Sequence, residues 1–237
     1  MSVRTVILHY HLFKNAGTSF DGILRRNFPS SWVSREFDNP NNAERVSAWI
    51  ESEPSATAFS SHTANGPVPA IPGVRVISCL FLRDPIARIR SAYQFERRQI
   101  LARGDAASPE QRARHASLEA YVRARLAVRG DCQCRDFHCA RLASFVPGPE
   151  PELERAKAGL ERLSFVGRVE DFQRSMAQFC ALATPVWPGF DAPAMHLNRS
   201  DHDESDVMDA ALSELLEGSN LADRALIRHA ERTLWAV

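Results

Sequence analysis

The sequence predicts an α/β fold in which helices flank a central, mostly parallel sheet, and three observations lead to that prediction. Short apolar runs that fit buried strands alternate along the chain with longer segments of helical periodicity. The most apolar run, residues 74–82, has the continuous pattern of a central parallel strand that is buried on both faces. No Pro-, Gly- or Ser-rich linker divides the chain, so residues 1–237 are expected to form a single domain.

The expected elements follow one another in a regular order. Each strand is short and apolar, and each helix shows apolar residues at helical spacing between turn-forming residues. Up to residue 109 we expect a strand at 5–9, a loop at 13–17, a helix at 18–28, an irregular segment at 29–40, a helix at 43–53, a strand at 57–61, a loop at 65–73, the strand at 74–82, a helix at 85–102 and a turn at 104–109. Beyond it we expect helices at 110–128, 137–145 and 151–162, a strand at 164–167, a helix at 170–183, an irregular segment at 184–199, and helices at 205–216 and 221–235.

Charge and composition narrow the class of protein. Twenty-nine basic residues balance 29 acidic ones and the pI is about 7.1, which disfavours a nucleic-acid-binding role. The first apolar segment is too short for a secretory leader, and no run approaches the length of a membrane span. Five sparse cysteines do not form a disulfide framework and fit a reducing compartment. We therefore expect a soluble, cytoplasmic protein with neither nucleic acid nor a membrane as its partner.

The first segment with chemical character is 11–19 (HLFKNAGTS), between a predicted strand and a predicted helix. Unpaired backbone N–H groups and the positive end of the helix dipole favour an anion at such a helix start. Lys14 adds a charge, and Thr18 and Ser19 add hydroxyl donors. In a Walker A loop the lysine follows the last glycine, whereas here Lys14 precedes the segment's glycine. The segment is a candidate phosphate or sulfate cradle, although an ordinary strand–helix turn would look the same.

The second segment is 82–93 (LRDPIARIRSAY), which follows the strand at 74–82. Ligands of parallel α/β sheets bind at the carboxyl ends of the strands, where Arg83 stands. Ser91 is two helical turns further along, on about the same side, and arginine suits a multidentate anion contact. Asp84 is a good helix cap whether or not the segment binds anything.

Together the two segments resemble the cofactor signatures of sulfotransferases that use 3′-phosphoadenosine 5′-phosphosulfate (PAPS). The resemblance is closest to the branch that contains heparan sulfate 2-O-sulfotransferase and related carbohydrate sulfotransferases. That family has H-x-P-K-[TS]-[GA]-[GS]-T-S, similar to 11–19, and [LF]-R-[DN]-P-x-x-R-x-x-S-x-[YF], similar to 82–93. Three shorter stretches fit in family order: Ser61-His62 with Gly66, 165–172 (FVGRVEDF), and 197–200 with Asp223.

The chain also departs from the family pattern. Phe13 stands where the family has proline, Asn15 where it has Thr or Ser, and Ser61 where it has glycine. The resemblance implies a three-layer P-loop-like fold and transfer of a sulfuryl group from PAPS to an acceptor hydroxyl, first of all on a saccharide. It implies adenosine 3′,5′-bisphosphate as product and no metal requirement.

The resemblance also implies a role for individual residues. Lys14 would hold the bridging oxygen as the leaving phosphate gains charge, and His62 would take the proton from the acceptor hydroxyl. Arg83 and Ser91 would bind the 3′-phosphate. The N–H groups of Ala16 to Ser19, with the hydroxyls of Thr18 and Ser19, would grip the 5′-phosphate, and Asn198 and Ser200 would close over the cofactor. The full set of cofactor-binding residues implied is Lys14, Asn15, Ala16, Gly17, Thr18, Ser19, Arg83, Ser91, Asn198 and Ser200.

Several alternatives stay open at this point. His9 and His11 compete with His62 for the role of base, with His9 expected to be structural and His11 to orient the loop. A P-loop-type kinase or nucleotide hydrolase, and a non-catalytic nucleotide- or glycan-binding module on the same fold, are the competing functions. The C-x-C pair Cys132 and Cys134 with His138 and Cys139 favours reduced thiols over zinc or a disulfide. The arginine-rich stretch 112–129 is interpreted as a solvated helix face, or as part of a groove for an anionic acceptor.

Overall fold

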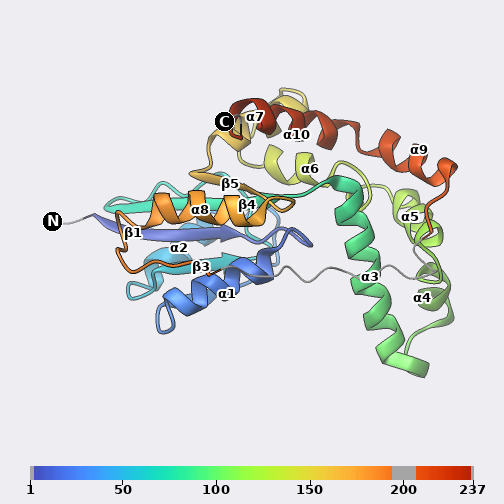
Figure 1. The fold of residues 1–237 in the computed structure, drawn as a ribbon, viewed down its shortest axis with the longest axis horizontal. Helices are drawn as coiled ribbons and strands as arrows, with labels where there is room; N and C mark the ends of the chain where they lie inside the picture. Colours follow the sequence, from blue (N-terminus) through green and yellow to red (C-terminus); the bar gives the residue numbers. More distant parts are fainter. Residues whose placement is uncertain (1–2, 194–206, 236–237) are drawn as a thin grey trace.

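The computed structural model describes residues 3–193 and 207–235, and within them the chain forms one five-stranded parallel sheet (Figure 1). The strands are β1 (Arg4–Tyr10), β2 (Trp32–Ser34), β3 (Ala58–Ser61), β4 (Val74–Leu82) and β5 (Phe165–Arg168). They lie in the order β2-β3-β1-β4-β5, and every neighbouring pair is parallel. The predicted α/β class with a parallel sheet is confirmed.

Helices cover both faces of this sheet. Those up to residue 127 are α1 (Gly17–Asn27), α2 (Ala43–Ser52), α3 (Pro85–Arg103), α4 (Pro109–Arg114) and α5 (Leu118–Ala127), with a 3₁₀ turn at Gly104–Ala106. The later ones are α6 (Phe137–Ala143), α7 (Glu152–Glu161), α8 (Phe172–Ala183), α9 (Ala210–Ser219) and α10 (Leu221–Thr233). None of the helices in the described ranges is long and apolar enough to cross a membrane.

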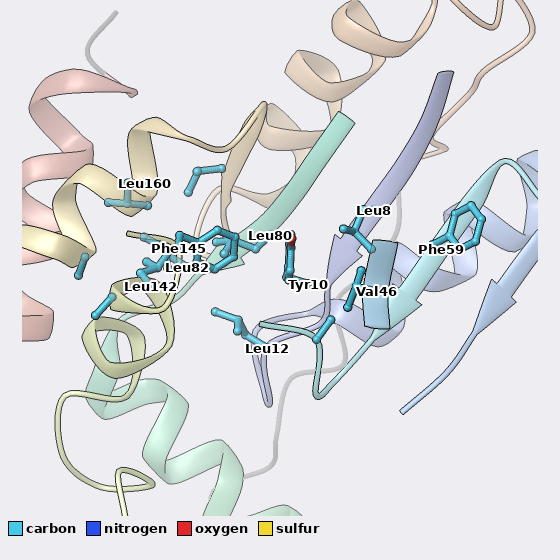
Figure 2. Packing of buried hydrophobic residues seen from close by; sticks show 14 of the residues in the cluster. Leu8, Tyr10, Leu12, Val46, Phe59, Leu80, Leu82, Leu142, Phe145 and Leu160 are labelled. Atoms are coloured by element: carbon cyan, nitrogen blue, oxygen red, sulfur yellow. The ribbon is translucent and has the colours of Figure 1, made fainter. Parts of the chain in front are cut away.

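The alternation of side chains along β1 divides the core into two layers. Ile7 faces the layer made with α1 and α8, where Phe20 and Phe179 pack edge to face. Leu8 faces the opposite layer, which α2, α6 and α7 complete; Figure 2 shows its members, among them Val46, Leu142 and Leu160. Helices on both faces of a parallel sheet give the three-layer, P-loop-like arrangement that the resemblance implied.

A third apolar cluster lies beyond the sheet. It joins α3 to α5 and α9 through buried residues such as Ile89, Tyr121 and Leu216. These helices stand at the end of the molecule toward which the strands run (Figure 1). The cluster therefore holds α3 next to the carboxyl edge of the sheet, where ligands of this class of fold bind.

Some element boundaries differ from those expected. The central strand is β1, whereas β4 lies between β1 and β5 and is fully buried only from Ile77 onward. The helix expected at 110–128 is two helices, because Ser117 caps α5 and so starts a new helix after the end of α4. The segment at 29–40 contains the short edge strand β2. The helix expected from 205 begins at Ala210, after its cap Asp209; residues 205 and 206 lie outside the described ranges.

Candidate functional site

A cavity of about 580 Å³ opens at the carboxyl edge of the sheet. Three loops meet there, because β3, β1 and β4 are neighbours and all run in the same direction. The cavity is lined by the loop after β1 and the start of α1, by the end of β3, by the end of β4 with α3, and by Val169 after β5; the residues are His11, Phe13, Lys14, Ala16, Gly17, Thr18, Ser19, His62, Arg83, Ser91, Phe95, Arg98 and Val169. Most of the site residues expected from the sequence thus lie around one space.

The loop between β1 and α1 presents backbone N–H groups to this cavity. Lys14 and Ala16 adopt left-handed conformations, with φ of 63° and 58°, and α1 has no side-chain N-cap. Among the described residues, the N–H groups of Ala16, Gly17 and Thr18 have no hydrogen-bond partner, whereas that of Ser19 donates to the Ala16 carbonyl at 3.0 Å. Unpaired N–H groups at the positive end of a helix can hold an anion. The loop at 11–16, called the anion loop below, therefore has the geometry expected of such a cradle, and its binding of an anion stays a prediction.

Gly17 is required here by a close approach. A Cβ at this position would lie 2.1 Å from Cδ2 and 2.3 Å from Nε2 of His11. The imidazole of His11 therefore rests directly on the first turn of α1. The spacing between His11 and Gly17 in segment 11–19 is explained by this packing.

Three cationic side chains line the same cavity. Arg83 donates from Nη1 to the carbonyl of Lys14 at 3.1 Å, which ties the end of β4 to the anion loop. Nζ of Lys14 lies 4.6 Å from the ring centroid of Phe95 on α3. Burial, followed by the charges of Arg98 and Arg83, lowers the pKa of Lys14. Ser91 of α3, 4% exposed, completes this wall. Crowded cations of this kind favour a multiply charged anion between them.

His62 stands at the end of β3 with a carboxylate behind it. Its Nδ1 donates to Oε1 of Glu36 at 2.7 Å, while the side chains of His62 and Glu36 are 53% and 50% exposed. The backbone N–H groups of His62 and Thr63 also donate to Glu36. Burial alone would raise the pKa of Glu36, but the hydrogen bonds from His62 and Thr63 outweigh it and lower this pKa. The carboxylate fixes the ring orientation and leaves Nε2 for a ligand.

Sequence reasoning missed Glu36. It follows β2 in a segment that was expected to be irregular, and nothing in its neighbours distinguishes it from a surface glutamate. Its role depends on β2 pairing with β3, which places the two strand ends side by side. Recognition of β2 as a strand would have been the one signal for it.

His11 and His9 share a second carboxylate. Nδ1 of His11 lies 2.9 Å from Oδ2 of Asp21, and Nδ1 of His9 lies 2.8 Å from Oδ1 of the same residue. The ring of His11 also stacks on that of His62, with centroids 3.8 Å apart and an interplanar angle of 29°. His9 is 1% exposed and does not line the cavity, which leaves His62 and His11 as the candidate bases.

The His9–His11–Asp21 group has the spacing of a metal site, and among the described residues it is the one group that does. Its ligand atoms lie within 4.8 Å of one another, but the same atoms are joined by the His–Asp hydrogen bonds. Burial alone raises the pKa of Asp21, but hydrogen bonds from His11 and His9 lower it far below the ordinary range, while burial lowers the pKa of His9. The Nδ1 atoms of both histidines and the Asp21 carboxylate are therefore engaged with one another by hydrogen bonds.

Asn15 lies in the loop but faces away from the cavity. Its Oδ1 accepts from Nε2 of His138 at 3.0 Å, and its Nδ2 donates to the Phe13 carbonyl at 3.0 Å. Nδ1 of His138 donates in turn to Asp223 of α10 at 2.8 Å. The structure therefore places the Asn15 side chain as a tether between the loop and α6, rather than as a wall of the cavity.

Two further groups of residues that the sequence singles out remain. Asn198 and Ser200 lie outside the described residues. All five thiols are free; Cys134 and Cys139 are buried, and burial raises the pKa of each to about 12. His138 is engaged by Asn15 and Asp223, so it does not face those thiols as a zinc ligand.

Comparison with known proteins places the chain in a family without assigning a reaction. No family model matches the sequence. A protein of Archaeoglobus fulgidus described as uncharacterized is 38% identical over 205 residues, covering 82% of this chain and 79% of the relative. The chain belongs to the same family as this archaeal protein. For this chain, the chemistry that bears on a reaction is that of the residues lining the cavity.

Proposed function

We propose that this protein is a sulfotransferase that moves the sulfuryl group of 3′-phosphoadenosine 5′-phosphosulfate to an acceptor hydroxyl. The observation that carries the proposal is the convergence, around one cavity, of an anion loop, three cationic side chains and a carboxylate-held histidine. These parts come from the ends of three neighbouring strands and are the parts that the motif resemblance implied.

The residues present fit this cofactor. The unpaired N–H groups of Ala16, Gly17 and Thr18, with the hydroxyls of Thr18 and Ser19, suit the 5′-phosphosulfate. Arg83 and Ser91 lie on the α3 side of the same cavity and suit a second phosphate, which is the group that distinguishes this cofactor from ATP. Bound there, PAPS supplies an activated sulfuryl group.

The protein's own residues position and polarise the reacting groups. Lys14 holds negative charge as it develops on the leaving oxygen. Nε2 of His62 accepts the proton of the acceptor hydroxyl, and Glu36 at Nδ1 stabilises the imidazolium that results. As in phosphoryl transfer, most of the catalysis is positioning and charge stabilisation. A saccharide hydroxyl is the proposed acceptor class, by analogy with the family that the motifs resemble.

A kinase or nucleotide hydrolase fits the cavity less well. Nucleotide hydrolysis and transfer from ATP require carboxylates for Mg²⁺, and among the described residues no carboxylate lines the cavity. Glu36 stands behind His62 and is held there by hydrogen bonds from the backbone N–H groups and the side chains of His62 and Thr63. The composition of the walls thus favours a metal-free anionic donor over a magnesium nucleotide.

Thermal unfolding with adenosine 3′,5′-bisphosphate, ATP and 5′-AMP tests the proposal. At a ligand concentration 100 times Kd, binding adds about 2.7 kcal/mol, or about 5–10 °C for a chain of this size. We expect this shift with the bisphosphate alone. Arg83→Ala should abolish it, and Arg75→Ala, an exposed arginine of the same strand, should retain it. A shift with ATP instead would establish the kinase alternative, and equal shifts with all three nucleotides would contradict the proposal.

Turnover separates an enzyme from a binding module. Release of the bisphosphate from PAPS in the presence of saccharide acceptors should depend on His62. Specific binding without any transfer across a broad acceptor panel would favour the non-catalytic module on the same fold.

A further inference from the structure

His11 is a second histidine of the cavity, and its surroundings differ from those of His62. Its side chain lines the cavity, with Nε2 over the first turn of α1, 2.3 Å from the position of a Cβ at Gly17. Nδ1 is fixed by Asp21, and Nε2 has no hydrogen-bond partner among the described residues. The ring can therefore offer Nε2 to whatever binds at the start of α1.

We propose that His11 binds the anion held at the N-terminus of α1 as an imidazolium, so that anion binding and proton uptake by His11 occur together. In that form Nδ1–H donates to Asp21 and Nε2–H donates to an oxygen of the anion. The inference rests on the anion-binding part of the proposed function and gives that site a donor beyond the loop N–H groups and Lys14.

The charges around His11 explain why the proton arrives with the anion. Asp21 on α1 favours the imidazolium, whereas Lys14 of the loop, and Arg83 and Arg98 across the cavity, disfavour it. His9 on β1 shares Asp21 with His11, and burial lowers the pKa of His9. The ring of His62 stacks on that of His11, and Glu36 is hydrogen-bonded to His62. A dianion that enters between these cations compensates them and tips the balance toward protonation.

The arrangement also assigns different tasks to the two stacked histidines. Asp21 is 4% exposed and is held by His9 and His11 together, so the His11 ring cannot turn without loss of a buried hydrogen bond. Glu36 and His62 are half-exposed, so solvent and an incoming acceptor can reach His62 more readily than His11. His11 therefore acts on the anion and His62 on the acceptor, although their rings touch.

Inorganic sulfate is the probe that tests this inference, because it keeps its double negative charge throughout the range from pH 6 to pH 8. Affinity is measured by calorimetry at constant ionic strength across that range. One linked proton makes the affinity fall by up to about tenfold per pH unit. We expect this slope in the wild type and in His62→Gln, and a flat profile in His11→Gln, whose amide still offers a donor near the position of Nε2.

A second measurement uses the wild type alone, so that the test does not depend on how a variant folds. Calorimetry at pH 7 in two buffers with different ionisation enthalpies counts the protons taken up with each sulfate. Uptake of a measurable fraction of a proton, up to one, is expected. No uptake, no sulfate binding, a slope that persists in His11→Gln, or a slope lost in His62→Gln would each overturn the inference.

The outcomes also distinguish this inference from the proposed function. A proton-linked sulfate site without preference for the bisphosphate over ATP would support the role of His11 and contradict the cofactor. Selective bisphosphate binding without proton uptake would support the cofactor and contradict the role of His11.

Discussion

The His62–Glu36 and His138–Asp223 pairs have the same chemical groups and opposite surroundings. His62 uses Nδ1 for its carboxylate, is half-exposed, and lines a cavity, with Nε2 left without a hydrogen-bond partner among the described residues. His138 and Asp223 are both 0% exposed, and the second ring nitrogen of His138 is occupied by Asn15. The comparison shows that an imidazole–carboxylate pair becomes a candidate for proton transfer only where one ring nitrogen is left for a ligand.

The buried pair has a structural task that the exposed pair lacks. Asp223 accepts from Nδ1 of His138 and from the backbone N–H groups of His138 and Cys139, so it closes the start of α6 and joins it to α10. Through Asn15 the same network holds the anion loop. In the proposed function, the loop is therefore stabilised by His138, and proton transfer at its rim belongs to a different histidine, His62.

The largest expected effect concerns the exposed pair. His62→Gln should lower turnover with PAPS by about 10²- to 10⁴-fold, which is the usual contribution of a general base. The bisphosphate-induced shift in unfolding temperature should remain, because the cationic walls and the loop are unchanged. Steady-state turnover and thermal unfolding measured on the same preparation check both parts.

The matched variant for this prediction is His138→Gln. It should impair stability and leave the turnover of the folded fraction close to that of the wild type. Full activity in His62→Gln would remove His62 as the base and leave His11, the other histidine that lines the cavity.

The second effect is on stability and concerns Asp223. Asp223→Ala leaves the buried His138 without its carboxylate and two N–H groups of α6 without an acceptor. Loss of one partner of a buried pair costs about 3–5 kcal/mol of the free energy of unfolding, or about 6–20 °C in unfolding temperature for a chain of this size. Chemical denaturation measures the loss.

Asp209→Ala provides the control for that loss. Asp209 is an exposed carboxylate that caps α9 through the N–H of Leu212 at 2.7 Å. Removal of such a cap costs about 1 kcal/mol. Equal losses in the two variants would show that the buried network is no stronger than a surface cap, and the comparison would fail.

The sequence predicts the parts of this molecule that depend on local pattern. The run at 74–82 and the helix from Pro85 could be found because continuous apolar residues and a proline at the first turn are local signals. Motif spacing singles out Lys14, Arg83 and His62, and the parallel sheet brings the strand ends that carry them around one cavity, while their functional roles stay predictions.

The parts that the sequence does not predict depend on distant pairing. Glu36 comes next to His62 because β2 pairs with β3. Asp21 of α1 is bonded by His9 of β1 and by His11 of the following loop, because both side chains point at α1. Asn15 occupies a motif position yet turns toward α6, because His138 lies 123 residues further along the chain and offers it a buried partner. No local pattern contains that contact.

The third prediction concerns how much the Glu36 carboxylate contributes to turnover through His62. Glu36→Gln keeps an oxygen that can accept from Nδ1 of His62 but removes the charge that stabilises its protonated form. Because the pair is half-exposed, we expect a modest fall of about tenfold in turnover, equivalent to about 1.4 kcal/mol. Glu51→Gln, an exposed residue of α2, should leave turnover unchanged. A loss as large as that of His62→Gln would show that solvent screens the pair far less than its exposure implies.

The smallest expected effect is the acid dependence of stability. Both carboxylates, Asp223 and Glu36, should contribute less to the free energy of unfolding as the pH falls, but the loss should be larger at Asp223. Burial alone raises the pKa of Asp223, but His138 and the N–H groups of α6 lower it below the ordinary value of 3.8. The unfolded state therefore binds more protons in acid, so the contribution of Asp223 is complete above about pH 4 and is lost as the pH falls through the lowered pKa. The difference in unfolding free energy between the wild type and Asp223→Asn should be constant from pH 5 to pH 7 and should shrink below pH 4.

Glu36 has a lowered pKa as well, so the difference in unfolding free energy between the wild type and Glu36→Gln should also shrink as the pH falls. We expect it to shrink by less, because half of the Glu36 side chain is in water. Denaturation curves for both pairs of proteins at pH 3, 5 and 7 measure the two trends. A larger acid-dependent loss at Glu36 than at Asp223 would reverse the assignment of the structural task to the buried pair.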